Sequence, residues 1–411
     1  MQQSSKSLSI NLRKNHWKSV TSQRKTTAYS KTPSTTTTNV LLSTMTTPSV
    51  PRTMRAIQVV EFNKPYQINT IPVPSDLGPH DLLVKVAVAS NCHTDSMVLE
   101  GVFHSALPQT ASHEGAGTVV SVGSAVQDFA AGDRVMCGLP LHPCGYCKDC
   151  LGPERQRQYC GNIDGHVGVT AQGCFAEYVK VDARSSTRLP REVSFMSAAP
   201  LACAGRTVWR SVLETELKAG EWICFVGSGG GLGHLGVQFA KALGLKIVGV
   251  DARDEGLALT KEYGADVVVD ARKGKGEAVK AVQAVTGGMG ADATVNLSDA
   301  SSAAGLACAV TKMHGLMVQI AQPDTVEIPF PELIFRDIRV RGSLICSPEE
   351  SKSMLKCIAE HGVTVKTNPF HGLDKIEDLV SMVHGGKIQG KAIIIVDDEQ
   401  IEREKELGAK F

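Results

Sequence analysis

The sequence predicts an α/β protein in which a β-rich domain accompanies a doubly wound parallel sheet. From residue 54 to about residue 205, short apolar runs of strand length alternate with turns rich in Pro, Gly and Asp, which is typical of a β-rich domain. After residue 208 the pattern changes to alternating strands and helices, which predicts a parallel sheet with helices on both faces. A glycine-rich turn between Trp222 and Asp251 joins two of these strands through a helix.

The length and composition of the chain limit the kinds of function that it could have. A chain of 411 residues, 42% of them hydrophobic, is long enough for two domains with buried cores. The formal net charge of +1 gives no indication of a nucleic-acid or acidic partner. No stretch approaches the roughly 20 apolar residues that a membrane-spanning helix needs, so we expect a soluble protein without a membrane partner. Half of the 12 cysteines fall in metal-like spacings, which suits a reducing compartment.

The first 53 residues differ in composition from the rest of the chain. Residues 1–60 contain nine Lys or Arg and no Asp or Glu, and they are rich in Ser and Thr. Such a leader cannot bury a core and is predicted to be disordered. A mitochondrial transit peptide has the same composition, whereas Met45 or Met54 could instead be the working start. We expect a cytoplasmic protein because the leader shows little helical periodicity, and the mitochondrial matrix is the alternative.

The predicted strands of the β-rich domain flank three segments that carry cysteine, histidine and acidic side chains. The strands are expected at residues 56–62, 81–89, 115–122, 134–138 and 175–181. The three segments read NCHTD at 91–95, SHEGAG at 112–117 and LACAG at 201–205. Their spacing does not decide whether they meet in the fold. Cys203 could be a small core residue, and His113 with Glu114 could be a solvated pair.

A cysteine-rich loop is a stronger local signal. Cys144, Cys147 and Cys150 are followed by Cys160, and four thiolates on one loop suit the tetrahedral preference of a structural zinc. An iron–sulfur cluster is the rival interpretation, but the bacterial cluster pattern places its fourth cysteine after three intervening residues and before a proline. Here the fourth cysteine comes later and precedes a glycine. Zinc is therefore the prediction, with a cluster or an unliganded loop as alternatives.

The glycine-rich turn predicts a dinucleotide site. Residues 227–236 read GSGGGLGHLG and lie between an apolar strand and a helical pattern that ends near residue 242. A helix N-terminus offers free N–H groups and a partial positive charge, and glycines let a pyrophosphate approach them. The phase of the pattern is open: the fingerprint fits Gly231, Gly233 and Gly236, but Gly227, Gly230 and Gly233 could equally line the turn. A glycine-rich loop without a ligand is the alternative.

Asp251 ends the second strand of this unit, about 20 residues after the turn. Its carboxylate is placed to accept hydrogen bonds from the 2′-hydroxyl of an adenosine ribose. The same carboxylate would repel the 2′-phosphate of NADP, so NAD is favoured, and nearby Arg253 softens this preference without reversing it.

The remaining segments complete the parallel sheet and end the chain. Strands are expected at 222–226, 246–251, 266–270, 292–296, 315–320 and 339–343, with helical patterns between most of them. Helical patterns near 349–360 and 376–383 precede a strand at 391–396. The charged tail from Asp397 is predicted to be a solvated helix or a frayed end.

Together these segments resemble the zinc-containing medium-chain alcohol dehydrogenases, especially the fungal fermentative type. The resemblance covers about residues 54–397 and rests on CHTD at 92–95, HEGAG at 113–117, the cysteine loop, CAG at 203–205 and the glycine turn with its aspartate. It implies a GroES-like catalytic domain formed by residues 54–204 and 345–411, and a central Rossmann domain at 205–344 that binds NAD. It also implies two zinc ions per chain, one catalytic and one structural, and a homo-oligomer, by family a tetramer.

The resemblance further implies a role for each matching residue. The catalytic zinc would be held by Cys92, His113 and Cys203, with Glu114 as a ligand that gives way to the substrate. Asp95 would orient the ligand histidine, and the hydroxyl of Thr94 would be the first carrier of the alcohol proton. The residues expected to contact NAD are His93, Gly227, Gly230, Gly231, Gly233, Asp251, Arg253, Ile320, Ala321, Gln322 and Lys391. The implied reaction transfers a hydride between a primary or secondary alcohol, or its aldehyde or ketone, and the nicotinamide, with zinc as a Lewis acid.

Three positions depart from the family pattern. Cys160 arrives two residues later than the fourth loop cysteine of the fungal enzymes. Glu100 stands where the family has a proton-relay histidine, so either Glu100 is the relay base or the proton leaves through water. Phe103 and Leu139 stand in place of tryptophans that narrow the ethanol pocket, which predicts a roomier site for an alcohol bulkier than ethanol.

Two other functions remain as alternatives. A zinc-free quinone or enoyl reductase could use the same scaffold, but it has no reason to place Cys92, His113 and Cys203 in this pattern. A non-catalytic dinucleotide-binding protein would need only the fold. The metal content of the purified protein separates the dehydrogenase from both.

Overall fold

The computed structural model describes residues 50–410. The expected leader, apart from its last four residues, lies outside the described residues, and so does the choice between a transit peptide and a later start at Met45. No helix in the described part of the chain is both long enough and apolar enough to cross a membrane.

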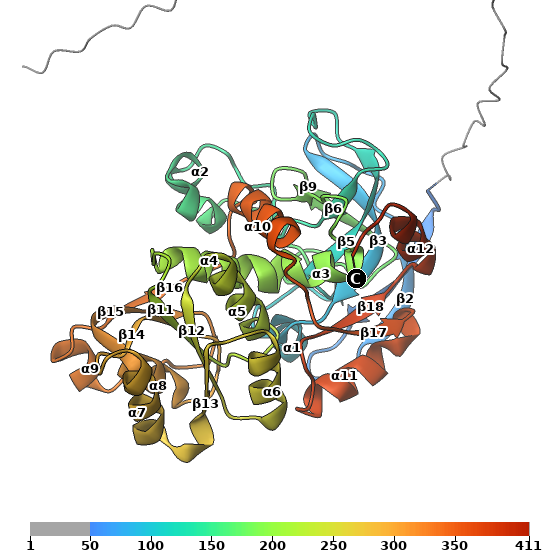
Figure 1. The fold of residues 1–411 in the computed structure, drawn as a ribbon. Coiled ribbons are helices and arrows are strands. Elements are labelled where there is room, and N and C mark those ends of the chain that lie inside the picture. Colours follow the sequence, from blue (N-terminus) through green and yellow to red (C-terminus); the bar gives the residue numbers. More distant parts are fainter. Residues whose placement is uncertain (1–49, 411) are drawn as a thin grey trace, which may run out of the picture. The chain divides into compact units, whose positions relative to one another are not determined.

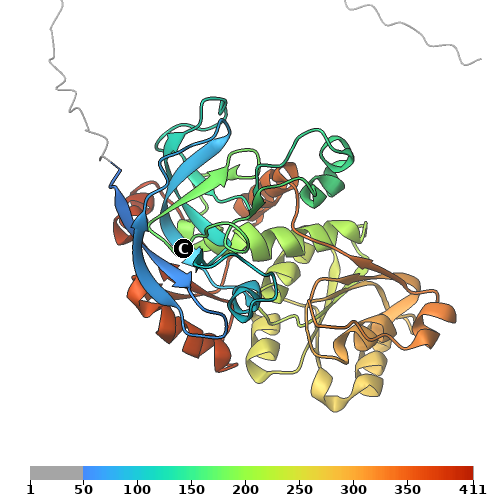
Figure 2. The same cartoon turned by 180° about the vertical axis from the view of Figure 1, so that it is seen from behind.

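The β-rich part is organised around β3 (Asp81–Ser90), a buried strand with partners on both edges. It pairs antiparallel with β5 (Glu114–Val122) and with β18 (Lys391–Ile395). The resulting seven-stranded sheet has the order β10-β6-β5-β3-β18-β17, and β9 also pairs with β3. Because β18 lies beside β3, the last strands of the chain, red-orange in Figures 1 and 2, return to its first strands, in blue.

Shorter elements complete this part. The strands β2, β1 and β4 form a separate three-stranded sheet, and β7 pairs with β8. The strands are β1 (Thr53–Val59), β2 (Gln67–Pro72), β4 (Gln109–Thr110), β6 (Arg134–Met136), β7 (Pro140–Leu141), β8 (Gly165–His166), β9 (Tyr178–Asp182), β10 (Thr187–Arg188) and β17 (Thr367–His371). The helices are α1 (His93–Glu100), α2 (Lys148–Leu151), η1 (Glu154–Tyr159), α3 (Phe195–Pro200) and the π-helical turn η2 (Leu201–Gly205).

Residues 222–342 contain a six-stranded parallel sheet of order β13-β12-β11-β14-β15-β16. Its strands are β11 (Trp222–Val226), β12 (Lys246–Asp251), β13 (Val267–Asp270), β14 (Ala291–Asn296), β15 (Thr311–Gln319) and β16 (Arg339–Gly342). The helices that precede and connect them are α4 (Arg206–Glu214), α5 (Gly233–Ala242), α6 (Asp254–Glu262), η3 (Ala271–Lys273), α7 (Lys275–Val285), α8 (Ala303–Val310) and α9 (Phe330–Ile334). The chain order reverses between β11 and β14, and ligands bind doubly wound sheets at such a switch point.

Helices cover both faces of this sheet because β11 is apolar on both of its faces. Ile223 and Phe225 pack in one core cluster with Phe239 of α5. Cys224 and Val226 pack in another cluster, which includes side chains of α7 and α8. Successive side chains of a strand point to opposite faces, so this alternation places α5 on one face and α7 with α8 on the other (Figure 1).

The C-terminal helices return to the β-rich part. They are α10 (Pro348–His361), η4 (Leu373–Lys375), α11 (Ile376–His384) and α12 (Asp398–Glu406). The expectation that the tail is solvated or frayed was wrong for one face of α12. Glu404 is buried, accepts a hydrogen bond from the Phe195 backbone N–H at 2.8 Å and pairs with Arg134 at 2.5 Å. A buried contact of this kind, more than 200 residues away in the chain, has no local sequence signal.

The predicted fold class is confirmed, and each of the six predicted parallel strands is present, although some of their ends differ from the prediction. The strand expected at 175–181 begins only at Tyr178, because the backbone N–H of Phe175 bonds to Ala111 outside the ladder with β3. The last parallel strands also differ, since β15 begins at Thr311 and β16 ends at Gly342. All six strands fall within 205–344, the range predicted for the Rossmann domain, and the domain limits stay a prediction.

Candidate active site and metal centres

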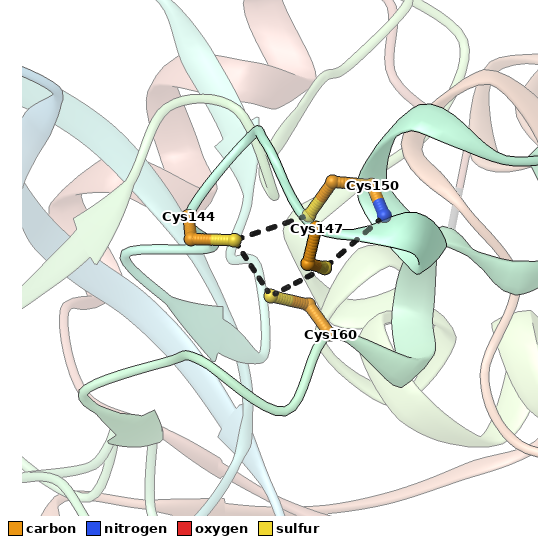
Figure 3. Close-up of side chains that lie close together, drawn as sticks. All are labelled: Cys144, Cys147, Cys150 and Cys160. Carbon is orange, nitrogen blue, oxygen red and sulfur yellow. Dashed lines mark hydrogen bonds between the residues drawn. The ribbon is translucent and has the colours of Figure 1, made fainter.

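The cysteine loop brings four sulfur atoms together (Figure 3). The Sγ of Cys144 lies 3.7 Å from that of Cys160 and 4.0 Å from that of Cys150, and Cys147 lies 3.8 Å from Cys160. Cys147 is also the N-cap of α2 and accepts a hydrogen bond from the Cys150 N–H at 3.4 Å. A tetrahedron with metal–sulfur bonds of about 2.3 Å has sulfur–sulfur edges of about 3.8 Å, so the spacing fits a zinc ion.

The loop also favours the charged form of one thiol. Burial acts to raise the pKa of Cys144, but the backbone N–H groups of Tyr146 and Cys147 and the thiols of Cys147 and Cys160 together lower the pKa to about 6. The thiolate is the form that binds a metal. The late position of Cys160 is accommodated by η1, which carries the chain from Pro153 back to the other three cysteines.

A second cluster joins the three dispersed segments of the β-rich part. The ligand atoms of Cys92, His113, Glu114 and Cys203 all lie within 4.8 Å of one another. Cys92 is the N-cap of α1, Glu114 begins β5, and Cys203 lies in the π-helical turn η2. The alternative of a solvated His113–Glu114 pair is therefore wrong, since both side chains are buried beside the two thiols. Cys203 does pack against apolar side chains, as a small core residue would, but its Sγ also belongs to this cluster.

Asp95 ties this cluster to the backbone. Its Oδ2 accepts a hydrogen bond from the Cys92 N–H at 2.8 Å, and its Oδ1 accepts one from the Ser112 N–H at 3.2 Å and lies 3.3 Å from His113 Nδ1. The imidazole is 2% exposed, yet neither ring nitrogen has a well-formed hydrogen bond within residues 50–410. A buried imidazole whose Nε2 has no hydrogen bond and whose Nδ1 lies beside a carboxylate has the arrangement of a metal ligand, so the cluster fits a metal with Asp95 behind the histidine.

Glu114 has two partners from distant elements. Its Oε1 accepts a hydrogen bond from the Ala204 N–H at 3.2 Å, and its Oε2 lies 2.7 Å from Nζ of Lys391, on β18. Burial raises the pKa of Glu114 to about 7, with Lys391 acting in the opposite direction. The pKa of Cys92 is lowered by the Cys203 thiol and by Lys391. Lys391 therefore offsets part of the negative charge that two ionised thiols and a carboxylate would concentrate here.

The three residues of α1 for which the family resemblance implies a role in proton transfer or cofactor binding differ in exposure. His93 is exposed at the start of the helix, Thr94 is half-buried in its first turn, and Glu100 is exposed at its end. Glu100 is not among the groups gathered with Cys92. Its exposure favours the alternative in which a proton leaves through water.

An apolar cluster lies against Cys203. It contains Val98, Leu139, Val169 and Ile345, with Phe103 and Cys203 packed against them. Leu139 and Phe103, which stand where the family has tryptophans, thus lie beside the cluster of Cys92, His113, Glu114 and Cys203. Their side chains are smaller than an indole, and a roomier substrate site stays a prediction.

The glycine turn follows the phase that begins at Gly227. This residue comes directly after β11 with φ +86°, and Gly233 is the first residue of α5. A Cβ at Gly233 would lie 2.3 Å from the carbonyl oxygen of Gly227, so the turn closes tightly there. Gly230 and Gly231 lie between them, and a Cβ at Gly231 would lie 2.9 Å from the Lys391 side chain. Gly236 instead packs against Phe225 within the helix.

A cavity of about 620 Å³ opens beside this turn at the carboxyl ends of the parallel strands. Gly227, Gly230, Asp251 and Arg253 line it. The Asp251 carboxylate accepts hydrogen bonds from the N–H groups of Gly229 at 2.9 Å, Ala252 at 2.9 Å and Arg253 at 3.0 Å. These bonds fix the carboxylate at the cavity wall.

The segment expected at the nicotinamide lies at the same edge of the sheet. Ile320 and Ala321 follow β15 and donate backbone hydrogen bonds to Asn296 at 3.0 and 3.2 Å, and Gln322 is exposed. Sequence reasoning missed several contributors: the Ala204 N–H, the pairing of Lys391 with Glu114, and the cavity-lining residues Lys275 and Ser298. The last two follow β13 and β14, so the rule that ligands bind at strand carboxyl ends could have indicated them.

Comparison with known proteins agrees with this geometry. A family profile described as zinc-binding dehydrogenase matches residues 231–360, and one described as alcohol dehydrogenase GroES-like domain matches residues 78–191. An alcohol dehydrogenase of Rhizobium meliloti is 34% identical over 348 residues, which covers 83% of this chain and 98% of that protein.

Solved structures give the same result. The alcohol dehydrogenase of Aeropyrum pernix superposes with a TM-score of 0.76 at 29% identity and covers 83% of this chain and 99% of its own. A structure titled NAD-dependent alcohol dehydrogenase has a TM-score of 0.76 at 25% identity and covers 84% of this chain and 100% of its own. The protein is therefore an oxidoreductase that belongs to the zinc-binding alcohol dehydrogenase family.

Proposed function

We propose that the protein is a zinc-dependent, NAD-dependent alcohol dehydrogenase that acts on alcohols bulkier than ethanol. The observation that carries the proposal is the convergence of Cys92, His113, Glu114 and Cys203 from three separate segments of the chain. A zinc-free reductase or a non-catalytic dinucleotide-binding protein would need no such cluster.

Different side chains would bind the metals, orient a metal ligand and transfer the substrate proton. Cys92, His113 and Cys203 would hold the catalytic zinc, and Cys144, Cys147, Cys150 and Cys160 the structural one. When bound, zinc would supply Lewis acidity toward the alcohol oxygen and NAD would accept the hydride. The carboxylate of Asp95 would keep the His113 ring in one orientation. The Thr94 hydroxyl can accept the substrate proton and donate its own, and the proton then reaches water past the exposed end of α1.

The nucleotide half of the site would bind NAD along the strand ends. The adenosine would occupy the cavity beside Gly227, with a ribose hydroxyl donating to Asp251, and the pyrophosphate would lie against the glycine turn. Lys391 passes close to Gly231 and adds positive charge near that turn. His93, Arg253 and residues 320–322 would make further contacts with the cofactor.

Self-association is part of the proposal. β16 is the edge strand of the parallel sheet, and all four of its residues are exposed. Phe330, Ile334 and Phe335 in and beside α9 are 65%, 70% and 69% exposed. An open edge with apolar neighbours is typical of a surface that pairs with another copy, so we propose a homo-oligomer, by family a tetramer. We further propose a cytoplasmic location, with the mitochondrial matrix as the alternative.

Metal content tests the two cysteine clusters. We expect two zinc ions per chain in the purified protein by plasma mass spectrometry. Cys147→Ser should lose one ion, whereas Cys203→Ser should lose the other and reduce kcat/KM by on the order of 100-fold or more. Cys308→Ser, in the buried helix α8 and outside both clusters, is the control and should keep both ions. A wild-type protein with one ion or none would contradict the proposal.

Cofactor preference tests Asp251. Asp251→Asn keeps the shape of the side chain but removes its charge, so the ratio of kcat/KM for NAD to that for NADP should fall by about 10 to 100-fold. Asp254→Asn removes the same charge from an exposed neighbour and should leave the ratio unchanged. An unaltered ratio in Asp251→Asn would show that this carboxylate does not select the cofactor.

Substrate size tests the apolar cluster beside Cys203. With NADH absorbance as the readout, branched or aromatic alcohols should give a higher kcat/KM than ethanol, and Leu139→Trp should move the preference back toward ethanol because an indole fills the space. The ratio between two alcohols is independent of the folded fraction of the variant. Val102→Trp adds the same ring at an exposed position and serves as the control. A clear preference of the wild-type protein for ethanol would refute the prediction.

A further inference from the structure

A second cavity, of about 220 Å³, lies apart from the proposed cofactor and substrate positions. Its wall is formed by the cysteine loop with η1, by the first residue of α4 and by the N-terminal end of α10. The charged groups in the wall are Arg157, Arg184, Arg206, Glu154 and Glu349. Four of these five groups form ion pairs with protein side chains, whereas Arg206 does not within the described residues. An unpaired buried charge of this kind suggests a site for an anionic ligand.

Arg206 is the group without a counter-charge. It is 1% exposed and is the largest fully buried side chain of residues 50–410. Its Nη2 donates to the Cys346 carbonyl oxygen at 2.7 Å and its Nη1 to that of Ser185 at 3.4 Å, while its Nε has no partner. Within the described part of the chain no carboxylate pairs with it, although a buried charge is costly unless it is paired.

The other charges of the wall already have partners. Arg157 lies 3.0 Å from Glu154, Arg184 lies 2.6 Å from Asp182, and Glu349 pairs with Lys352 at 2.7 Å. The cavity therefore has one uncompensated positive charge. A guanidinium offers a planar set of donors that matches a carboxylate.

An acceptor of the same wall is also without a partner. Gln158 is 7% exposed, and its side-chain nitrogen donates to the Arg155 carbonyl at 3.0 Å, which leaves Oε1 facing no donor. Oε1 of Glu154 is likewise buried and has no hydrogen-bond donor within reach among residues 50–410. A ligand that satisfied both groups would carry a carboxylate for Arg206 and a hydrogen-bond donor for Gln158. Pro140, Pro143 and Pro348 also line the cavity and add apolar surface, which suits a short carbon skeleton.

We propose that this cavity is a second, non-catalytic binding site for a small carboxylate with a donor group on the neighbouring carbon, either a hydroxycarboxylate or an amino acid. Cys150 lines the cavity, and Arg206 follows Cys203 by three residues on one continuous helical segment. Occupancy would thus stabilise the segments that carry both cysteine clusters. The site does not depend on the identity of the alcohol substrate or on hydride transfer.

Thermal unfolding of the purified holoenzyme tests this site, with glycolate, glycine, acetate and chloride added at matched ionic strength. At roughly ten times its Kd, glycolate or glycine should raise the midpoint by about 1 to 2 °C. Acetate lacks the donor and should act more weakly, and chloride should have no effect. The comparison of glycolate with glycine identifies the donor as a hydroxyl or an ammonium group.

Three variants locate the binding. Arg206→Leu should lose the response to every carboxylate, and Gln158→Leu should respond to glycolate or glycine no better than to acetate. Cys308→Ser, in the buried helix α8 and outside this cavity, should keep the wild-type response. Equal responses to chloride and glycolate in the wild-type protein would overturn the proposal, as would loss of the response in Cys308→Ser. If Arg206→Leu does not fold, Gln158→Leu decides: a donor preference that survives there overturns the proposal.

Discussion

The antiparallel ladder between β3 and β5 is the constraint on which the candidate active site depends. Its register places Ser90 opposite Glu114, so Cys92, two residues beyond one strand, lies next to His113, one residue before the other. β18 pairs with the same end of β3, with Ile393 opposite Ser90, and this brings Lys391 to Glu114. The Ala204 N–H bonds to Glu114 and fixes the turn that carries Cys203. Adjacent ends of β3, β5 and β18 therefore bring together groups from four segments that are distant in the sequence.

Charge balance at this edge follows from the same pairing. Two thiols and a carboxylate gathered in a buried site would repel one another if all were ionised. The buried ammonium of Lys391 offsets part of that charge, and it also lies close to the glycine turn of the parallel sheet. The metal-like cluster and the proposed phosphate position thus share one cation. Oxidation of an alcohol removes a proton from its oxygen and a hydride from the adjacent carbon, so the Cys92 cluster and the nucleotide site must keep a fixed distance and orientation. Lys391 contacts both and so helps to fix their relative position.

The parts that could be predicted from sequence were those with a local physical signal. Alternating strands and helices gave the six parallel strands, and the spacing of Cys144, Cys147 and Cys150 gave a loop whose sulfurs do converge. The meeting of Cys92, His113 and Cys203 could not be derived from spacing, because it depends on strand register and on a π-helical turn, and it came only through family resemblance. Buried ion pairs such as Lys391 with Glu114 and Arg134 with Glu404 were missed, since each side chain by itself resembles an exposed charge.

The proposed catalytic centre requires that the thiols of Cys92 and Cys203 and the imidazole of His113 bind one metal ion. Zinc K-edge X-ray absorption on the Cys147→Ser variant tests it most directly, because only the second cluster should then retain zinc. We expect two sulfur neighbours at about 2.3 Å and lighter N or O neighbours at about 2.0 to 2.1 Å. A coordination shell made only of sulfur, or one without sulfur, would show that Cys92, His113 and Cys203 do not bind the metal together.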